Sequence, residues 1–322
     1  MALLTVNDLF QRKKEVLQLE VLTGDVGLDR IIPGPEASSP GLALAGFTKR
    51  FFSQRLHVLG ETEIEYLRSL TPEDRKDTWQ QFMNFDIPCV FVTKGQRVPK
   101  ELISVAKEHA TPLIRSKLKT AEFYQRLTPY IAEVFAPNTK VHGCLADVFG
   151  VGLFFMGRSG IGKSECVLDL VERGHRLVAD DSVIITQRGT DVLIGQSPEL
   201  TYCHMEIRGV GIIDVSALFG VHAVRRQKRI EVAVQLVDWE RAEEADRTGL
   251  EARTTTILGV ELPKVVVPLN PGKNITVVSE VVAMNHLLKY SGVDSARILN
   301  DRLVAQMAEQ RELREYLSED YE

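Results

Sequence analysis

Residues 157–164 form the strongest chemical motif in the sequence. They read Gly-Arg-Ser-Gly-Ile-Gly-Lys-Ser and match the pattern G-x-x-x-x-G-K-[ST]. Glycines let backbone N–H groups converge on phosphate oxygens, and the helix expected to follow directs its positive end at the same place. An apolar run at 152–156 precedes the motif, which argues against a plain glycine turn before a helix. The motif predicts a nucleotide or polyphosphate site formed by Gly157, Arg158, Ser159, Gly160, Ile161, Gly162, Lys163 and Ser164.

Two adjacent carboxylates, Asp180 and Asp181, directly follow the apolar run 177–179. Strand ends are where ligands bind in α/β sheets. One carboxylate can hold Mg²⁺ while the other accepts a proton from an attacking hydroxyl. A solvated Asp-Asp turn is the alternative, and it is less favoured behind a phosphate loop.

Two further side chains could join this site. His142 lies about fifteen residues before the loop and would return to it if the intervening strands form a hairpin. There it could donate to a phosphate oxygen or tune a neighbouring acid, although a lone histidine is more often structural. Glu206 could complete a metal shell, or form an ordinary surface ion pair with Arg208.

Two segments near the C-terminal end carry cations. Arg247 could stabilise a transferring phosphoryl group, or form only an i,i+4 pair with Glu243 on a solvated helix. The segment 268–274 is a Pro-Gly turn by default, yet Lys273 on such a turn can approach phosphate.

An α/β fold is expected to position these residues. In the first part of the chain, strands at 56–59 and 90–92 alternate with helices at 63–70, 99–110 and 119–135. Beyond the break at Pro137, a hairpin or two short strands are expected within 141–156, a helix at 164–173, and strands at 176–179, 183–186, 192–194 and 230–237. The pattern indicates an N-terminal α/β domain at 1–130 and a C-terminal phosphate-binding domain at 131–322. A charged helix with an apolar stripe is expected at 294–317.

Composition excludes several classes of protein. The 322 residues are 44% hydrophobic and 26% charged, as in an ordinary globular protein. The formal charge of -5 gives no support for nucleic-acid binding by bulk electrostatics, although a local basic patch remains open. No apolar run approaches the ~20 residues of a membrane span, and no secretory signal is recognised. Four widely separated cysteines fit no zinc spacing and indicate reduced thiols in the cytoplasm.

Taken in order along the chain, these segments resemble the bacterial HPr kinase/phosphorylase family, whose members phosphorylate a seryl hydroxyl of the phosphocarrier protein HPr and also remove that phosphate. No single segment would be enough for the comparison. The matching segments are 40–42 with Gly46 and Arg55, 60–61, 142–143, 157–164, 180–181, 206–215, Arg247 with Gly249, 271–272 and 280–285.

The resemblance implies a role for each matching position. The loop with Lys163 would bind ATP or pyrophosphate, and Ser164 and Glu206 would hold Mg²⁺. Asp181 is favoured over Asp180 as proton acceptor in phosphorylation and donor in the reverse reaction, with Asp180 nearer the metal. His142 and Arg247 would position and stabilise the phosphoryl group. Segment 206–215 would serve both reactions, and segment 268–273 mainly the reverse one.

The resemblance also implies the architecture and the partners. The C-terminal domain would be a P-loop kinase domain like that of phosphoenolpyruvate carboxykinase, and the chain would form a homohexamer acting on HPr or a paralogue. The sequence departs from the family at one loop. The common pattern there is proline-valine-arginine-proline-glycine-arginine-asparagine, whereas Asn270 and Lys273 replace the two arginines. Lysine keeps the charge but loses the planar fork, which predicts weaker or differently regulated phosphate-dependent removal.

Two other functions are compatible with a phosphate loop. In a nucleotide-gated regulator, ATP binding would change how the N-terminal domain or the helix at 294–317 contacts a partner, without phosphotransfer. A small-molecule P-loop kinase is less favoured because no arginine-rich lid segment is recognised. Loss of phosphotransfer with retained nucleotide binding in Asp181→Asn would identify an enzyme, whereas a regulator would keep its partner response.

Overall fold

The structure, a computed structural model, describes residues 4–240, 251, 253–269 and 274–319, with side chains up to residue 311. The chain divides into two compact units, Met1–Ala136 and Pro137–Glu322. The division follows helix α6 (Thr120–Val134), a few residues after the position expected from the sequence. Each unit is described by itself.

The first unit is built on a five-stranded sheet in the order β2-β7-β6-β5-β4. Strands β4 to β7 are parallel and β2 is antiparallel to β7. Its strands are β1 (Leu4–Thr5), β2 (Leu19–Val21), β3 (Ile31–Ile32), β4 (Ala37–Ser38), β5 (Leu56–Leu59), β6 (Val90–Val92) and β7 (Leu113–Ser116). Its helices are α1 (Val6–Lys13), α2 (Gly41–Leu44), α3 (Glu61–Ser69), α4 (Pro72–Met83), α5 (Lys100–Glu108) and α6.

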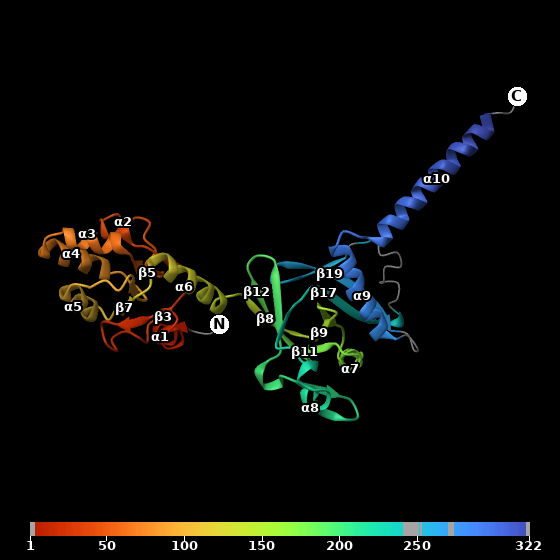
Figure 1. Cartoon of the computed structure of the whole chain (residues 1–322), viewed down its shortest axis with the longest axis horizontal. Helices are drawn as coiled ribbons and strands as arrows, with labels where there is room; N and C mark the ends of the chain where they lie inside the picture. The colour runs from red at the N-terminus through yellow and green to blue at the C-terminus, as the bar shows by residue number, and fades with distance from the viewer. Residues whose placement is uncertain (1–3, 241–250, 252, 270–273, 320–322) are drawn as a thin grey trace. The chain divides into compact units, whose positions relative to one another are not determined.

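Both faces of this sheet are buried. Side chains alternate between the faces along each strand, so Phe91 of β6 joins the core under α1 and α6 while Val90 and Val92 join the core under α3 to α5. This burial explains why the strands read as continuous apolar runs. The unit is therefore an α/β domain with helices on two sides (Figure 1).

The second unit holds the phosphate loop between β10 (Val151–Met156) and α7 (Lys163–Glu172). Its other strands are β8 (Asn138–His142), β9 (Cys144–Val148), β11 (Arg176–Ala179), β12 (Ser182–Arg188), β13 (Val192–Gln196), β14 (His204–Ile207), β15 (Gly211–Asp214), β16 (Gln227–Arg229), β17 (Val232–Asp238), β18 (Thr254–Ile257) and β19 (Val260–Leu269). Its other helices are α8 (Val215–Phe219), α9 (Ile275–Tyr290) and α10 (Ser295–Glu319), with short 3₁₀ turns at Glu199–Thr201 and Val221–Ala223.

Two larger sheets organise this unit. The six-stranded sheet has the order β11-β9-β10-β17-β19-β18, and the four-stranded sheet has the order β16-β13-β12-β8. Strands β10, β17 and β19 are parallel, so their carboxyl ends meet at one edge. The phosphate loop leaves β10 at this edge, which is where α/β sheets bind ligands.

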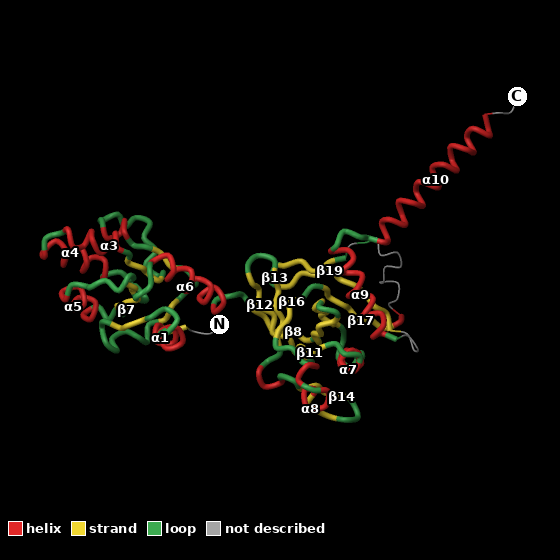
Figure 2. The backbone as a smooth tube through the Cα atoms, viewed as in Figure 1, coloured by secondary structure: helices red, strands yellow, loops and turns green. Residues whose placement is uncertain are grey.

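The core of the second unit has two layers, one on each side of the six-stranded sheet. Leu153 and Phe155 of β10 face the layer that contains α7 and α9, and Phe154 between them faces the layer shared with the four-stranded sheet. Figure 2 shows the strands of this unit gathered together, with helices at their margin. The buried sheet provides a rigid base for the loop that follows β10.

The α/β fold class with an N-terminal and a C-terminal domain is confirmed. The predicted strand at 176–179 is confirmed to the residue, and the hairpin expected within 141–156 is β9 paired with β10. Helices α1, α4 and α9 were not predicted. None of the helices in the described ranges is long and apolar enough to cross a lipid bilayer.

Candidate phosphate-binding site

The phosphate loop turns tightly at two glycines with left-handed backbone angles. Gly157 has φ +150°, and a Cβ there would lie 2.8 Å from the Leu236 carbonyl oxygen. Gly160 has φ +75°, and its nearest neighbour is the Arg208 side chain, which can move aside. Other residues rarely adopt these angles, so the turn requires both glycines, and a backbone oxygen also excludes a side chain at Gly157.

Lys163 is almost fully buried, at 5% exposed, at the start of α7. Its Nζ donates to the carbonyl oxygens of Gly157 (3.1 Å) and Arg158 (3.0 Å) and lies 3.1 Å from His142 Nε2. All three contacts lie at the mouth of the loop. The ammonium group is therefore held at the phosphate position by partners that a phosphate oxygen can replace.

Asp180 lies at the floor of the site, directly after β11. Its Oδ1 accepts hydrogen bonds from Ser164 Oγ (2.9 Å) and Cys144 Sγ (2.8 Å), and its Oδ2 accepts from the backbone N–H of Glu206 (3.3 Å). The carboxylate is 5% exposed. These donors fix it beside the hydroxyl that the sequence assigned to Mg²⁺.

Asp181 lies at the open side of the site. Its side chain is 75% exposed, and Oδ1 lies 3.1 Å from His142 Nδ1. A lysine ammonium has no acceptor, so His142 Nε2 accepts from Lys163, while the other ring nitrogen lies beside Asp181. Lys163, His142 and Asp181 therefore lie in one row of close polar contacts.

His142 lies close to Asp181 because of the four-stranded sheet. In that sheet β8 pairs with β12, which places His142 opposite Ser182. The Gly143 N–H also donates to the Asp181 carbonyl oxygen at 3.1 Å. Asp181 has φ +61°, a backbone angle that aspartate and asparagine tolerate better than most residues. The histidine thus reaches the loop through β8 and β12, while the β9–β10 hairpin separates it from the loop in sequence.

Glu206 and Arg208 lie at the rim, on and just after β14, and both line the pocket at the loop. This pocket has a volume of about 110 Å³ and is lined by His142, Cys144, Ser159, Gly160, Gly162, Lys163, Ser164, Glu165, Asp180, Asp181, Glu206 and Arg208. The small volume suits a phosphate group and leaves the rest of a donor or acceptor outside. Carboxylates, Lys163 and the start of α7 therefore converge on one small pocket.

The remaining loop residues have structural contacts. Ile161 is buried at 8% exposed and belongs to the core of the second unit, so it fastens the loop to the sheet. The Arg158 side chain forms an ion pair with Asp238. Among Arg158, Ser159 and Ile161, only Ser159 lines the pocket.

A divalent cation fits the donor set only together with phosphate oxygens. Within the described part of the chain, no three His, Cys, Asp or Glu side chains converge as a metal site. Mg²⁺ usually keeps waters and is held by one or two protein oxygens plus substrate phosphates. The Ser164 hydroxyl, Asp180 and Glu206 line the same pocket and match that pattern.

Three of the residues singled out from the sequence, Arg247, Asn270 and Lys273, lie outside the described residues. The strands that precede them are described. β17 ends at Asp238 and β19 at Leu269, paired side by side and parallel to β10. Both strands therefore end at the edge of the sheet that carries the phosphate loop.

Cys144 was not identified as a site residue from the sequence, where it was interpreted only as a reduced thiol. Cys144 is fully buried. Burial raises the pKa of its thiol well above the usual value, and the negative charge of Asp180 raises it further. The S–H therefore stays protonated and remains a donor to Asp180. No local sequence signal identifies this role, because the contact depends on β9 lying next to β11.

We expect Cys144 to resist iodoacetamide in the native protein at pH 8. Only the thiolate reacts, and a raised pKa keeps the thiolate population small at that pH. Half-buried Cys203 is the internal control and should react, and all four cysteines should react in urea. Peptide mass spectrometry measures each site. Native-state modification of Cys144 as fast as in urea would show that the floor of the site is not closed.

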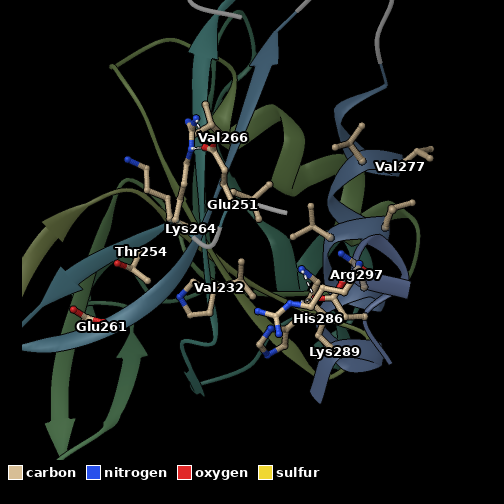
Figure 3. Close-up of a pocket in the computed structure, with 18 residues that line it drawn as sticks. Val232, Glu251, Thr254, Glu261, Lys264, Val266, Val277, His286, Lys289 and Arg297 are labelled. Atoms are coloured by element: carbon tan, nitrogen blue, oxygen red, sulfur yellow. Dashed lines mark hydrogen bonds and ion pairs between the residues drawn. The ribbon is translucent and has the colours of Figure 1, made fainter. Parts of the chain in front are cut away.

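A larger cavity of about 700 Å³ lies between the β17–β19 strands and α9. Figure 3 shows its lining, with Val232 and Val266 on strands and Val277 on α9. It contains no residue of the phosphate loop or of the Asp180–Asp181 pair. The candidate site is therefore the smaller pocket, where charged side chains converge, and not the larger cavity.

Comparisons with known proteins agree over nearly the whole chain. The family model described as HPr Serine kinase N terminus matches residues 4–131, and that described as HPr Serine kinase C-terminal domain matches residues 133–303. A relative named HPr kinase/phosphorylase from Chloroherpeton thalassium is 49% identical over 84% of this chain and 79% of its own. Another of that name from Halalkalibacterium halodurans is 42% identical over 94% of this chain and 96% of its own. A solved structure of the Hpr(Ser) kinase/phosphatase from Coxiella burnetii is 36% identical, covers 50% of this chain and 98% of its own, and has a TM-score of 0.45.

Proposed function

This chain belongs to the HPr kinase/phosphorylase family, and we propose that it phosphorylates a seryl residue of HPr with ATP or pyrophosphate and removes that phosphate with inorganic phosphate. The observation that carries the proposal is the placement of Lys163, His142 and Asp181 in close contact, one after the other, beside the loop. A cation for the transferred group and a base for the incoming alcohol thus lie at opposite ends of one imidazole ring.

In the forward direction the loop N–H groups and Lys163 hold the terminal phosphoryl group of the donor. The seryl oxygen attacks phosphorus, the bond to the leaving phosphate oxygen breaks, and the seryl proton passes to Asp181. Exposure of Asp181 on the open side allows a protein substrate to reach it. His142 positions that carboxylate, since its Nδ1 lies 3.1 Å from Asp181 Oδ1.

In the reverse direction the loop holds inorganic phosphate instead. A phosphate oxygen attacks the phosphorus of phosphoserine and pyrophosphate forms. The attacking phosphate gives its proton to Asp181, and the leaving seryl oxygen takes that proton. The two directions need the same loop, cation and carboxylate, so one pocket serves both. Arg247 is proposed to stabilise the transferring phosphoryl group from the segment that follows β17.

Mg²⁺ is proposed to neutralise charge on the phosphates when it is bound. Ser164 and Glu206 are the residues proposed to hold it. Asp180 orients the Ser164 hydroxyl at 2.9 Å and is itself fixed by Cys144 and the Glu206 N–H. The supporting observation is the closeness of these oxygens to Lys163 in one small pocket.

The partner and assembly form part of the same proposal. HPr or a paralogue is the substrate, the chain assembles as a homohexamer, and the reaction takes place in the cytoplasm. Exposed apolar side chains on α9 and α10, including Tyr290, Leu299 and Met307, support burial against other chains. Four free cysteines support a reducing compartment.

Incubation with ATP, Mg²⁺ and purified HPr tests the forward reaction. Mass spectrometry should find one phosphate on a seryl residue of HPr, and omission of Mg²⁺ should abolish it. If nucleotide binds but no phosphocarrier protein is phosphorylated, the nucleotide-gated regulator is the better account.

Restoring the two arginines of the family pattern should speed the reverse reaction. The double variant Asn270→Arg with Lys273→Arg is expected to raise the phosphorolysis rate severalfold, because two planar forks replace an amide and a point charge toward phosphate. The forward rate with ATP should change less than twofold. An unchanged phosphorolysis rate, measured as pyrophosphate released from phosphoserine-HPr, would overturn this expectation.

A further inference from the structure

The second residue of the phosphate loop has a partner outside the pocket. Arg158 Nε donates to Asp238 Oδ2 and Arg158 Nη2 donates to Asp238 Oδ1, both at 2.8 Å. The two parallel hydrogen bonds form a planar fork that fixes direction as well as distance. A lysine at position 158 could not form it.

The fork joins the ends of two neighbouring strands. β10 and β17 are parallel, and Met156 pairs with Gln235. Arg158 lies two residues beyond this pair on the first strand, and Asp238, the last residue of β17, lies three beyond it on the second. The contact therefore ties the first half of the phosphate loop to the strand that leads into residue 239.

Binding of a phosphate removes other restraints on this half of the loop. Lys163 Nζ holds the carbonyl oxygens of Gly157 and Arg158 in the free site, and the same ammonium must turn toward a bound phosphate. The Arg158–Asp238 fork uses neither Lys163 nor any residue lining the pocket. It can therefore persist through the reaction.

We propose that Arg158 and Asp238 act as a positioning pair that holds the phosphate loop in its binding conformation for polyphosphate ligands. The pair contacts no ligand itself. It acts through the loop backbone, whose N–H groups must already converge when phosphate arrives. This inference rests on the proposed function of the pocket and adds residues to it.

The pair is expected to affect ligand affinity more than folding. The two side chains are 65% and 41% exposed, and exposed ion pairs contribute little to the stability of the folded state. Asp238 raises the pKa of Arg158 above its ordinary value by hydrogen bonding and by charge, so the guanidinium stays charged. Movement of the loop, in contrast, misplaces every N–H group that faces the phosphate.

Pyrophosphate with Mg²⁺ is the probe for the test, and isothermal titration calorimetry measures its Kd for the full chain. Arg158→Ala and Asp238→Asn should each raise Kd about fivefold. The double variant should be no weaker than the worse single variant, because both remove one contact. Arg158→Lys should resemble Arg158→Ala, since the charge remains but the fork is lost.

Arg126→Ala is the matched control, because it removes an exposed arginine paired with Glu122 in the first unit, and its Kd should stay unchanged. In the Arg158 and Asp238 variants, the KM for the phosphoryl donor in the forward reaction should rise by the same factor as Kd. Their kcat should stay within twofold of that of the unchanged protein. Unchanged Kd in the single variants, additive losses in the double variant, or a fall in kcat alone would overturn the positioning role.

The two proposals fail differently. If pyrophosphate affinity responds as expected but HPr is never phosphorylated, the proposed function fails and the positioning pair stands. If HPr is phosphorylated and the variants bind pyrophosphate normally, only the positioning pair fails. Absence of pyrophosphate binding by the unchanged protein would overturn both.

Discussion

Replacing Lys163 with methionine is expected to lower phosphotransfer by about 10²–10³-fold in both directions, the loss typical of one removed electrostatic contact at developing charge. The ammonium is buried and held by two carbonyl oxygens and His142, so methionine removes a positive charge that the fold places at the phosphate position. The same factor should appear with ATP, with pyrophosphate and with inorganic phosphate, because all three occupy one loop.

Lys140→Met is the matched control, since Lys140 is an exposed lysine two residues before His142 on the same strand. Its rates should stay within twofold of those of the unchanged protein, and circular dichroism should confirm that both variants are folded. Loss of one direction only in Lys163→Met would mean that the two reactions use different phosphate sites.

Replacing Asp181 with asparagine should lower kcat by about 10²–10⁴-fold, the range for loss of a general base, while pyrophosphate still binds. Asparagine suits the position because it tolerates φ +61° and has nearly the same shape as aspartate. The side chain is largely exposed, so the substitution leaves no buried group without a partner. Loss of activity would therefore report the proton acceptor and not a misfolded chain.

Asp180→Asn separates the two carboxylates. Asp180 accepts a hydrogen bond from the Ser164 hydroxyl and does not lie on the open side of the site. This variant should therefore require more Mg²⁺ for half-maximal rate and recover part of its activity at high Mg²⁺. Asp181→Asn should not recover at any Mg²⁺ concentration. Recovery by Asp181→Asn and none by Asp180→Asn would reverse the assignment of base and metal support.

The parts of the site that could be predicted from the sequence are the local ones. The phosphate loop follows from glycine spacing and a flanking strand, and the Asp180–Asp181 pair follows from its place at the end of an apolar run. In both cases a few consecutive residues determine the geometry. The α/β class followed from the alternation of short apolar runs with amphipathic stretches.

The parts that could not be predicted depend on pairing between distant segments. His142 was expected near the loop, but the strand pairing that brings it to Asp181, β8 with β12, was not; Cys144 reaches Asp180 because β9 lies beside β11. The Arg158–Asp238 fork needs β17 next to β10. None of these pairings leaves a signal in the sequence around either partner.

Helix α9 illustrates a different limit. Its first half carries threonine and several valines, whose stiff side chains favour strands over helices. The segment nevertheless forms a helix, and its Ser279, Glu280 and Ala283 are buried against the second unit. Glu280 also binds Arg173 and His175 at the end of α7. Tertiary contacts therefore override the intrinsic preference of these residues.

The most direct test of the central claim follows the fate of phosphate in the reverse reaction. Phosphoserine-HPr is incubated with the protein, Mg²⁺ and radiolabelled inorganic phosphate, and the products are separated. We predict one labelled pyrophosphate for each HPr molecule that loses its phosphate, and no label in pyrophosphate with Asp181→Asn. Dephosphorylation of HPr with all label remaining in inorganic phosphate would contradict the account, because water and not a loop-bound phosphate would then be the acceptor.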